Sequence, residues 1–183
     1  MAETQNLECA RASRLLWIPW ILALFSLSVF CALAVVGWPG TFAAAGGGFC
    51  ETFRESAIKQ PANTWSNLGF VVAGLWVIRR VRFDLAGTVR PLNLIGRSTA
   101  LSTLYAALVV FLGPGSMAMH GSGTAWGGTT DVLSMLLYIA FPVTYAFVRV
   151  VGGGVRACGW LYAALAGGFG ISLVTGTLPF SGS

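Results

Sequence analysis

The sequence predicts an all-α polytopic transmembrane helix bundle, and three observations lead to this fold class. Of the 183 residues, 56% are hydrophobic and only 9% are charged, whereas a soluble domain carries about 25% charged residues. An intrinsically disordered chain is excluded as well, because disorder needs low hydrophobicity and a high net charge. The apolar residues gather into long uncharged stretches, and a spanning helix takes about 20 of them. The loops between these stretches leave room for about five spans.

The chain begins with a polar stretch, residues 1–14, which we expect to be a cytoplasmic N-terminal segment ahead of one transmembrane domain, residues 15–183. The first span is predicted over about residues 15–38, which carry no charge and have tryptophans near both ends, as membrane interfaces favour. A signal peptide is the competing interpretation, because the alanines at 43–45 suit a cleavage site. The apolar stretch is longer than the roughly 7–15 residues of a signal peptide core, which favours a retained helix.

A glycine-rich and then polar loop, residues 39–60, separates the first span from the second. The second span is predicted over about residues 61–80. Pro61 suits the first turn of a helix, where the N–H that proline lacks would have no partner. Arginines close this short span, and their long side chains can reach the interface from within a helix.

Three further spans are predicted over about residues 98–119, 131–149 and 158–178. Pro114, which lies between two glycines, should kink the first of them or break its hydrogen-bond ladder. Residues 120–130 are rich in glycine, serine and threonine and predict a short turn.

The residues around the last two spans predict how these helices begin and pack. Thr129 and Thr130 are the expected N-caps of the span that starts near Asp131. The last predicted span is rich in glycine, so we expect it to pack closely on its neighbours.

Positive charge is distributed unequally between the two sides predicted for these spans. With the N-terminus inside, only Arg54 and Lys59 fall in the outer loops. By the positive-inside rule, the loops 39–62 and 120–130 then lie outside. The net charge of +5 therefore indicates orientation and contact with anionic headgroups, and no basic arm or aromatic-studded basic sheet suggests a nucleic-acid partner. The inner residues are Arg11, Arg14, Arg79, Arg80, Arg82, Arg90, Arg97, Arg149 and Arg156.

The cysteines form no thiolate metal motif, since no two of them have C-x-x-C spacing. Only Cys50 is expected to face an oxidising side of the membrane, and it has no obvious disulfide partner. The four cysteines are Cys9, Cys31, Cys50 and Cys158.

Three polar side chains are predicted to converge at the outer end of the third span. His120 is the single histidine of the chain, and Ser116 precedes it by four residues, so both share one helix face. Asp131 follows at the mouth of the next helix. Taken singly, the aspartate suits a helix N-terminus and the histidine suits an interface. Together they indicate a functional site, because ionisable groups at membrane depth are costly and usually functional.

Several chemistries are compatible with these groups. A serine hydrolase would use Ser116 or Ser122 with His120 and Asp131, but the rhomboid-type proteases need a base histidine on a later helix, and none follows. A metal hydrolase would use His120 as a ligand, with Asp131 and Ser116 holding a metal-bound water. A transporter is disfavoured, because no acidic residue falls in the middle of a span.

The order and spacing of several short motifs resemble the alkaline ceramidases and their bacterial relatives, within a superfamily of seven-span hydrolases that includes the adiponectin-receptor-like proteins. No single motif is specific, and together they cover about residues 49–150. The segment 126–135 is similar to the bacterial branch in particular. The motifs are Cys50-Glu51, Asn63-Thr64-Trp65-Ser66-Asn67, Ser116-x-x-x-His120 and Asp131.

The resemblance implies a zinc-dependent hydrolase that cleaves the amide of a ceramide-like sphingolipid in a bacterial inner membrane. His120 is then a zinc ligand, Ser116 steadies the metal-bound water or the oxyanion, and Asp131 exchanges protons with that water. The lipid substrate would enter sideways from the outer leaflet. The resemblance says nothing about the oligomeric state.

This sequence differs from the family pattern at two points, and each difference leads to a further expectation. The family's other zinc ligands are an H-x-x-x-H pair on the last of seven spans, and this sequence has neither that pair nor, by our count, the last two spans. We therefore expect the zinc site to be incomplete and hydrolysis to require further C-terminal spans. A non-catalytic lipid-binding or scaffold protein on the same fold is the alternative.

The second departure concerns calcium, for which the resemblance makes Glu51 a possible ligand. Gln60 and Gly48 stand where the family has acidic residues, and calcium prefers several charged oxygens, so we expect none to bind. Three polar residues of the second span, Asn63, Ser66 and Asn67, are expected to hydrogen-bond between helices.

Overall fold

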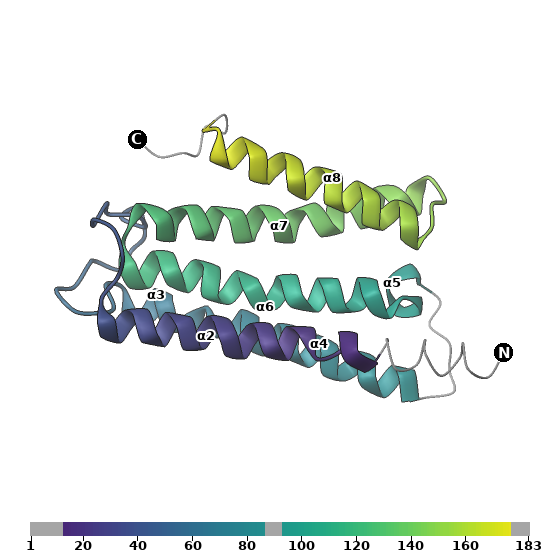
Figure 1. The fold of residues 1–183 in the computed structure, drawn as a ribbon, viewed down its shortest axis with the longest axis horizontal. Helices are drawn as coiled ribbons and strands as arrows, with labels where there is room; N and C mark the ends of the chain where they lie inside the picture. The colour runs from purple at the N-terminus through teal and green to yellow at the C-terminus, as the bar shows by residue number, and fades with distance from the viewer. Residues whose placement is uncertain (1–12, 87–92, 177–183) are drawn as a thin grey trace.

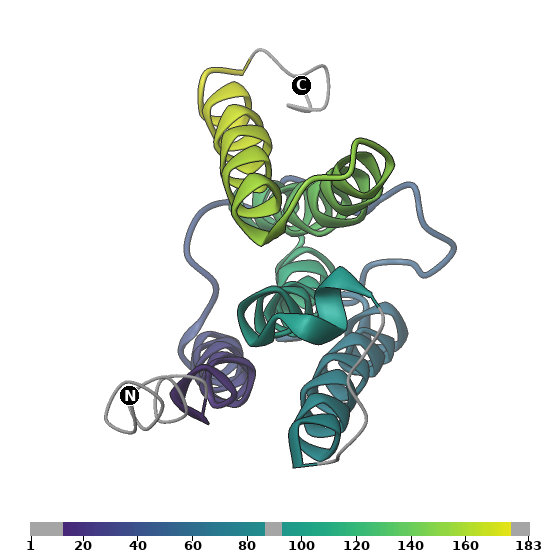
Figure 2. The same ribbon diagram turned by 90° about the vertical axis from the view of Figure 1, so that its right-hand side faces the viewer.

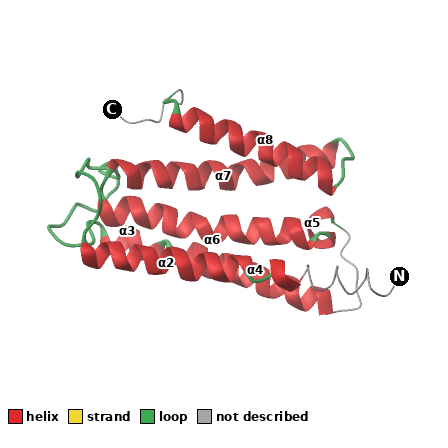
Figure 3. Cartoon of the chain, in the orientation of Figure 1, coloured by secondary structure: helices red, strands yellow, loops and turns green. Residues whose placement is uncertain are grey.

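The computed structural model describes residues 13–86 and 93–176, and these residues confirm the all-α fold class (Figures 1 and 3). No strand forms in the described ranges, where the only β pairing is an isolated bridge between Phe42 and Thr124. Most of the predicted N-terminal segment lies outside the described residues. The helices are α2 (Ile18–Val36), α3 (Pro61–Ser66), α4 (Leu68–Ala86), α5 (Leu94–Arg97), α6 (Thr99–Ser122), α7 (Ala125–Val150) and α8 (Val155–Val174).

Four helical segments are long and apolar enough to cross a membrane, and the chain is therefore a multi-pass membrane protein. The predicted span at 61–80 is helical, but the helix is interrupted at Asn67 and then continues to Ala86 as α4. It is not among the four, because four charged side chains fall in the C-terminal half of α4. The four segments are Ser13–Val36, Thr99–Ser122, Ala125–Val150 and Val155–Val174.

Helix α6 is the centre of the bundle, with α2 and α4 on one side and α7 and α8 on the other (Figure 2). Most of its residues are buried, whereas the buried residue of α8 is Cys158. α6 runs unbroken through Pro114, although proline removes one ladder hydrogen bond. The core of the molecule therefore surrounds the helix that carries Ser116 and His120.

Glycines bring the neighbouring helices close to α6. A Cβ placed on Gly74 of α4 would lie 2.6 Å from Val110, and one on Gly115 of α6 would lie 2.5 Å from Ser134 of α7. The expectation that α8 uses its glycines in this way is wrong, since Cβ atoms placed on them would meet nothing within 4 Å among the described residues. Those glycines are Gly159, Gly167, Gly168 and Gly170.

The predicted turn at 120–130 is much shorter in the structure. Only Gly123 and Thr124 separate α6 from α7. Gly123 adopts the left-handed conformation, with φ of 64°, and the Thr124 side chain accepts the hydrogen bond that caps α7. Thr129 and Thr130 are therefore not caps but donate to carbonyls within α7. Asp131 therefore lies nearly two turns inside the helix and not at its start.

Candidate functional site

Ser116 and Asp131 meet across the contact between α6 and α7. The Ser116 hydroxyl donates a hydrogen bond to Oδ1 of Asp131. Asp131 and His120 are each 6% exposed, so both ionisable groups lie inside the bundle. Helix geometry accounts for the serine and histidine sharing one side of α6, since residues four apart lie on the same face. The structure thus brings Ser116 and Asp131 into contact, whereas the direct contacts of the His120 ring are with other residues.

Gln60, the residue before α3, orients His120. Its Oε1 lies 2.6 Å from Nδ1 of the imidazole, and the whole side chain is buried. Its Nε2 lies 2.6 Å from the carbonyl oxygen of Glu51 and 3.1 Å from that of Gly46. Carbonyl oxygens only accept, so the amide nitrogen must face them and Oε1 must face the imidazole.

This arrangement fixes the tautomer of the neutral histidine. Because the Gln60 oxygen can only accept, Nδ1 of His120 carries the hydrogen and donates it. The other ring nitrogen, Nε2, then holds a lone pair. Such an Nδ1–H contact is the usual way in which proteins orient a histidine that acts through Nε2 as a ligand or a proton acceptor.

The loop between α2 and α3 is bound to the C-terminal end of α6. The N–H groups of Gln60 and Lys59 donate to the carbonyls of His120 and Gly121, at 3.0 and 2.9 Å. The N–H groups of Ala43 and Ala45 both donate to Gly123. These bonds satisfy carbonyls that a helix end otherwise leaves without partners.

The same loop also covers the histidine ring itself. The Phe49 ring stands edge-on to the imidazole, with the ring centroids 4.8 Å apart. His120 is therefore held from two directions by one loop, through the Gln60 amide and the Phe49 ring.

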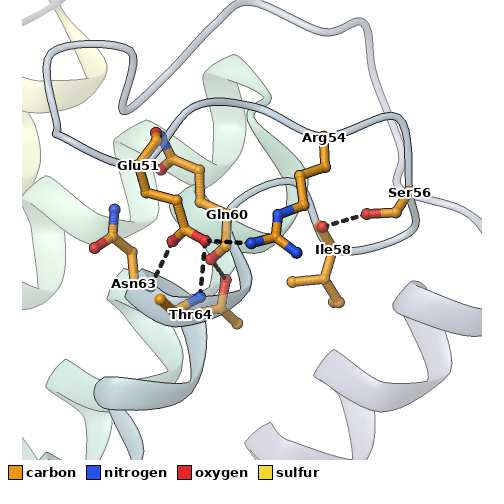
Figure 4. Close-up of polar contacts among 8 residues, drawn as sticks. Glu51, Arg54, Ser56, Ile58, Gln60, Asn63 and Thr64 are labelled. Atoms are coloured by element: carbon orange, nitrogen blue, oxygen red, sulfur yellow. Dashed lines mark hydrogen bonds and ion pairs between the residues drawn. The ribbon is translucent and has the colours of Figure 1, made fainter.

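Glu51 holds the first turn of α3 (Figure 4). Its two carboxylate oxygens accept from the N–H groups of Ala62 and Asn63, at 3.0 and 2.8 Å. Arg54 lies 3.8 Å away. Desolvation raises the pKa of the Glu51 carboxyl, but the two backbone hydrogen bonds and Arg54 outweigh it, so the pKa is lowered. Glu51 thereby anchors the segment that presents Gln60 to His120, and the expectation that no calcium binds at Glu51 stays a prediction.

The polar residues of α3 make local hydrogen bonds instead of the interhelical ones that were expected. Ser66 and the Asn67 amide both donate to the Asn63 carbonyl, at 2.9 and 2.7 Å. These bonds close the short helix where α3 gives way to α4, which explains why they stay within it. The side-chain nitrogen of Asn63 is buried without a hydrogen-bond partner among the described residues.

An apolar cavity of about 160 Å³ lies between α2, α6 and α7, on a different face of α6 from Ser116. Pro114 and Ala118 line it, and each is two residues from Ser116. Residues two apart on an α-helix point about 200° away from each other. The cavity therefore lies behind the site and does not open onto it.

The donor groups of this chain do not by themselves make a zinc site. A catalytic zinc takes three protein ligands, and the described residues contain no group of three histidine, cysteine or acidic side chains that could hold a metal. Nε2 of His120 is one suitable donor, whereas the Asp131 carboxylate already accepts the hydrogen bond of Ser116. The residues present supply only part of the coordination that the family resemblance implies.

No family model, curated protein or solved structure matches this chain. The resemblance to the alkaline ceramidases therefore depends on the motifs and their spacing.

Gln60 is the site residue that the sequence did not reveal. It was noted only as the replacement of an acid, yet it makes the closest polar contact of His120. Sixty residues separate the two, so no local spacing could have paired them. The one available signal was its place directly before Pro61, where a polar residue at the start of a helix is common.

Proposed function

We propose that this chain carries part of the active site of a membrane-embedded, metal-dependent hydrolase of lipid amides, similar to the alkaline ceramidases. The observation that supports the proposal is the Ser116–Asp131 hydrogen bond beside a buried histidine whose Nδ1 is held by Gln60. A purely structural role would not need an imidazole with a fixed tautomer next to a buried carboxylate. Buried ionisable groups in membrane proteins most often mark a functional site.

The residues of this chain have distinct roles in the proposal. Asp131 keeps one oxygen on Ser116 and has the other available to accept a proton from a water molecule. Ser116 orients that carboxylate by donating its single O–H to it. His120 contributes the Nε2 lone pair as one ligand of the metal. The family resemblance implies that the remaining ligands are an H-x-x-x-H pair, which these 183 residues do not contain.

We also propose that the site faces outward from a bacterial inner membrane, with the N-terminus in the cytoplasm. The site and the loop that covers it lie at one end of the bundle. Arginines of the described residues gather at the opposite end, where α2 and α6 begin and α4 and α7 end (Figure 1). This asymmetry supports the positive-inside assignment. Those arginines are Arg14, Arg79, Arg80, Arg82, Arg97, Arg149 and Arg156.

Zinc content and ceramide hydrolysis, measured on the same purified preparations of the protein, test the proposal. His120→Ala should lose the bound zinc and the activity together. Asp131→Asn should keep the zinc and lose turnover by about 10²–10⁴-fold, the usual contribution of a general acid or base. Thr129→Ala, an exposed change on the same helix, is the control. Equal turnover in all these proteins would contradict the proposal.

A non-catalytic lipid-binding protein is the second candidate, and the single histidine of the chain favours it. Such a protein would bind ceramide without cleaving it and would contain no stoichiometric zinc. Mass spectrometry of the lipid recovered after incubation separates the two functions, since only the hydrolase releases the fatty acid.

A further inference from the structure

A cavity lies at the end of the bundle opposite to the proposed active site. It has a volume of about 430 Å³ and is lined by Trp20 of α2 and by Arg79, Arg82 and Phe83 of α4. The beginning of α2 and the end of α4 lie near each other at this end (Figure 1). Cavities of this size hold small molecules in other proteins, where about 300–1,000 Å³ is common.

The two arginines of this cavity are stacked on aromatic rings. The Arg79 guanidinium lies 5.7 Å from the centre of the Phe83 ring, and that of Arg82 lies 5.4 Å from the centre of the Trp17 ring. Such contacts orient a guanidinium while leaving its N–H groups free to donate. The rings therefore position two planar donor groups one helical turn apart.

Neither arginine has an acidic partner among the described residues. The nearest acid on the helix, Asp84, is bound to Arg80 at 3.1 Å. Asp84 also lines a different, smaller cavity, together with Gly96 and Ser102. Within residues 13–86 and 93–176, two positive charges thus remain at the cavity without a counter-charge, which favours an anionic ligand.

The surroundings indicate a lipid as the source of that anion. At the start of α2, the N-cap residue Trp17 and the helix residues Ile21 and Leu24 are exposed, at the i, i+4 and i+7 spacing of one helix face. Tryptophan is typical of the level of lipid headgroups, and the aliphatic residues beside it suit acyl chains. A free inorganic anion would need no apolar surface next to its site.

We propose that Arg79 and Arg82, with Trp17, Trp20 and Phe83, bind the phosphate-bearing headgroup of an anionic phospholipid. Guanidinium groups form paired, charge-assisted hydrogen bonds with phosphate oxygens. Basic pockets between transmembrane helices recognise anionic headgroups in the same way. This site is separate from the one that holds His120 and does not depend on the function proposed for it.

The test measures binding of phosphatidylglycerol to the full chain in detergent by native mass spectrometry. The double variant Arg79→Gln with Arg82→Gln should bind this lipid about tenfold more weakly, as expected for two interfacial arginines. The control is Arg80→Gln with Arg156→Gln, which removes the same charge from the same end of the bundle but from outside the cavity. This control should bind nearly as well as the unsubstituted protein.

Other arms of the experiment separate the alternatives. Phosphatidylcholine, which carries phosphate without net charge, should bind more weakly than phosphatidylglycerol and should respond less to the double variant. An equal loss in the control would mean only general charge attraction, and displacement by millimolar inorganic phosphate would mean a site for the free anion. Either result overturns the proposal, as does unchanged binding in the double variant. A melting curve like that of the unsubstituted protein confirms that each variant is folded.

Discussion

Gln60 illustrates how much one uncharged side chain can control at the scale of the residue. Its amide makes three hydrogen bonds, two to loop carbonyls and one to His120. All three are buried or partly buried, where an unmatched polar group costs more than a hydrogen bond contributes. The residue therefore couples the position of the loop to the tautomer of the histidine.

Replacing Gln60 with Leu should destabilise the protein by about 2–4 kcal/mol, because two carbonyls and the Nδ1–H of His120 lose their partner. The same change should allow the hydrogen of the neutral His120 imidazole to lie on either ring nitrogen, which ¹⁵N NMR of the labelled imidazole detects. Thr52→Val, an exposed change in the same loop, should alter neither measurement. An unchanged tautomer in the leucine variant would show that another group holds His120.

Glu51 gives the loop a defined pH dependence. Its lowered pKa means that the ionised form is favoured by folding, so this stabilisation is complete above the ordinary value of 4.5. It is lost as the pH falls through the lower value of the folded state. The melting temperatures of the unsubstituted protein and of Glu51→Gln should therefore differ at neutral pH and converge as the pH falls below about 4.5.

Glu55→Gln, an exposed acid in the same loop, is the matched control for this measurement. It should follow the unsubstituted protein at every pH. A constant difference between the Glu51→Gln variant and the unsubstituted protein, down to the lowest pH, would mean that the carboxylate charge does not hold α3.

At the scale of the element, small residues decide how closely α6 and α7 approach. Such residues were interpreted as a turn at 120–130, because glycine, serine and threonine are common in loops. Several of them instead allow helix contacts. A Cβ on Gly121 would lie 2.9 Å from the Phe30 ring, and one on Gly127 would lie 2.6 Å from the Ala118 carbonyl. In a membrane, where apolar surface drives association weakly, this use of glycine is common.

Gly115→Ala should push α7 away from α6, because the added Cβ would fall 2.5 Å from the Ser134 hydroxyl. Overpacking of this kind costs about 1–3 kcal/mol, and it should also weaken the hydrogen bond between Ser116 and Asp131. Denaturation in mixed micelles measures the stability. Ser134→Gly in the same chain should restore most of it, since it removes the atoms that clash.

Gly159→Ala serves as the control, because a Cβ there meets nothing within 4 Å. It should leave stability unchanged or raise it by up to about 1 kcal/mol through helix propensity. Equal destabilisation by Gly115→Ala and Gly159→Ala would contradict the explanation that close helix packing requires glycine at position 115.

At the scale of the whole molecule, long uncharged stretches were enough to predict the four most apolar helices. Pro61 and a shorter apolar stretch closed by arginines predicted the helical segment that α3 and α4 form. The sequence also placed Ser116 near Asp131, because a short connection brings the end of one helix beside the start of the next. It did not place Gln60 or Phe49 against His120, since contacts between a loop and a helix 60 or more residues away follow from tertiary packing.

The proposed orientation predicts which cysteines a membrane-impermeant maleimide reaches in intact bacterial cells. In a chain with Cys9 and Cys31 replaced by alanine, the exposed Cys50 should be labelled from outside, and the buried Cys158 should not react. A cysteine introduced as Gly154→Cys, at the arginine-rich end, should react only after the cells are permeabilised. The reverse pattern would contradict an outward-facing site.

The two-residue connection between α6 and α7 has a consequence for biogenesis. With only Gly123 and Thr124 between them, the two helices must leave the translocation machinery as one hairpin. Asp131 then enters the lipid phase together with Ser116, so the acid already has its donor during insertion. The Asp131 carboxylate would be costly in a helix that inserted alone, and the Ser116 hydroxyl lowers this cost before the rest of the bundle assembles.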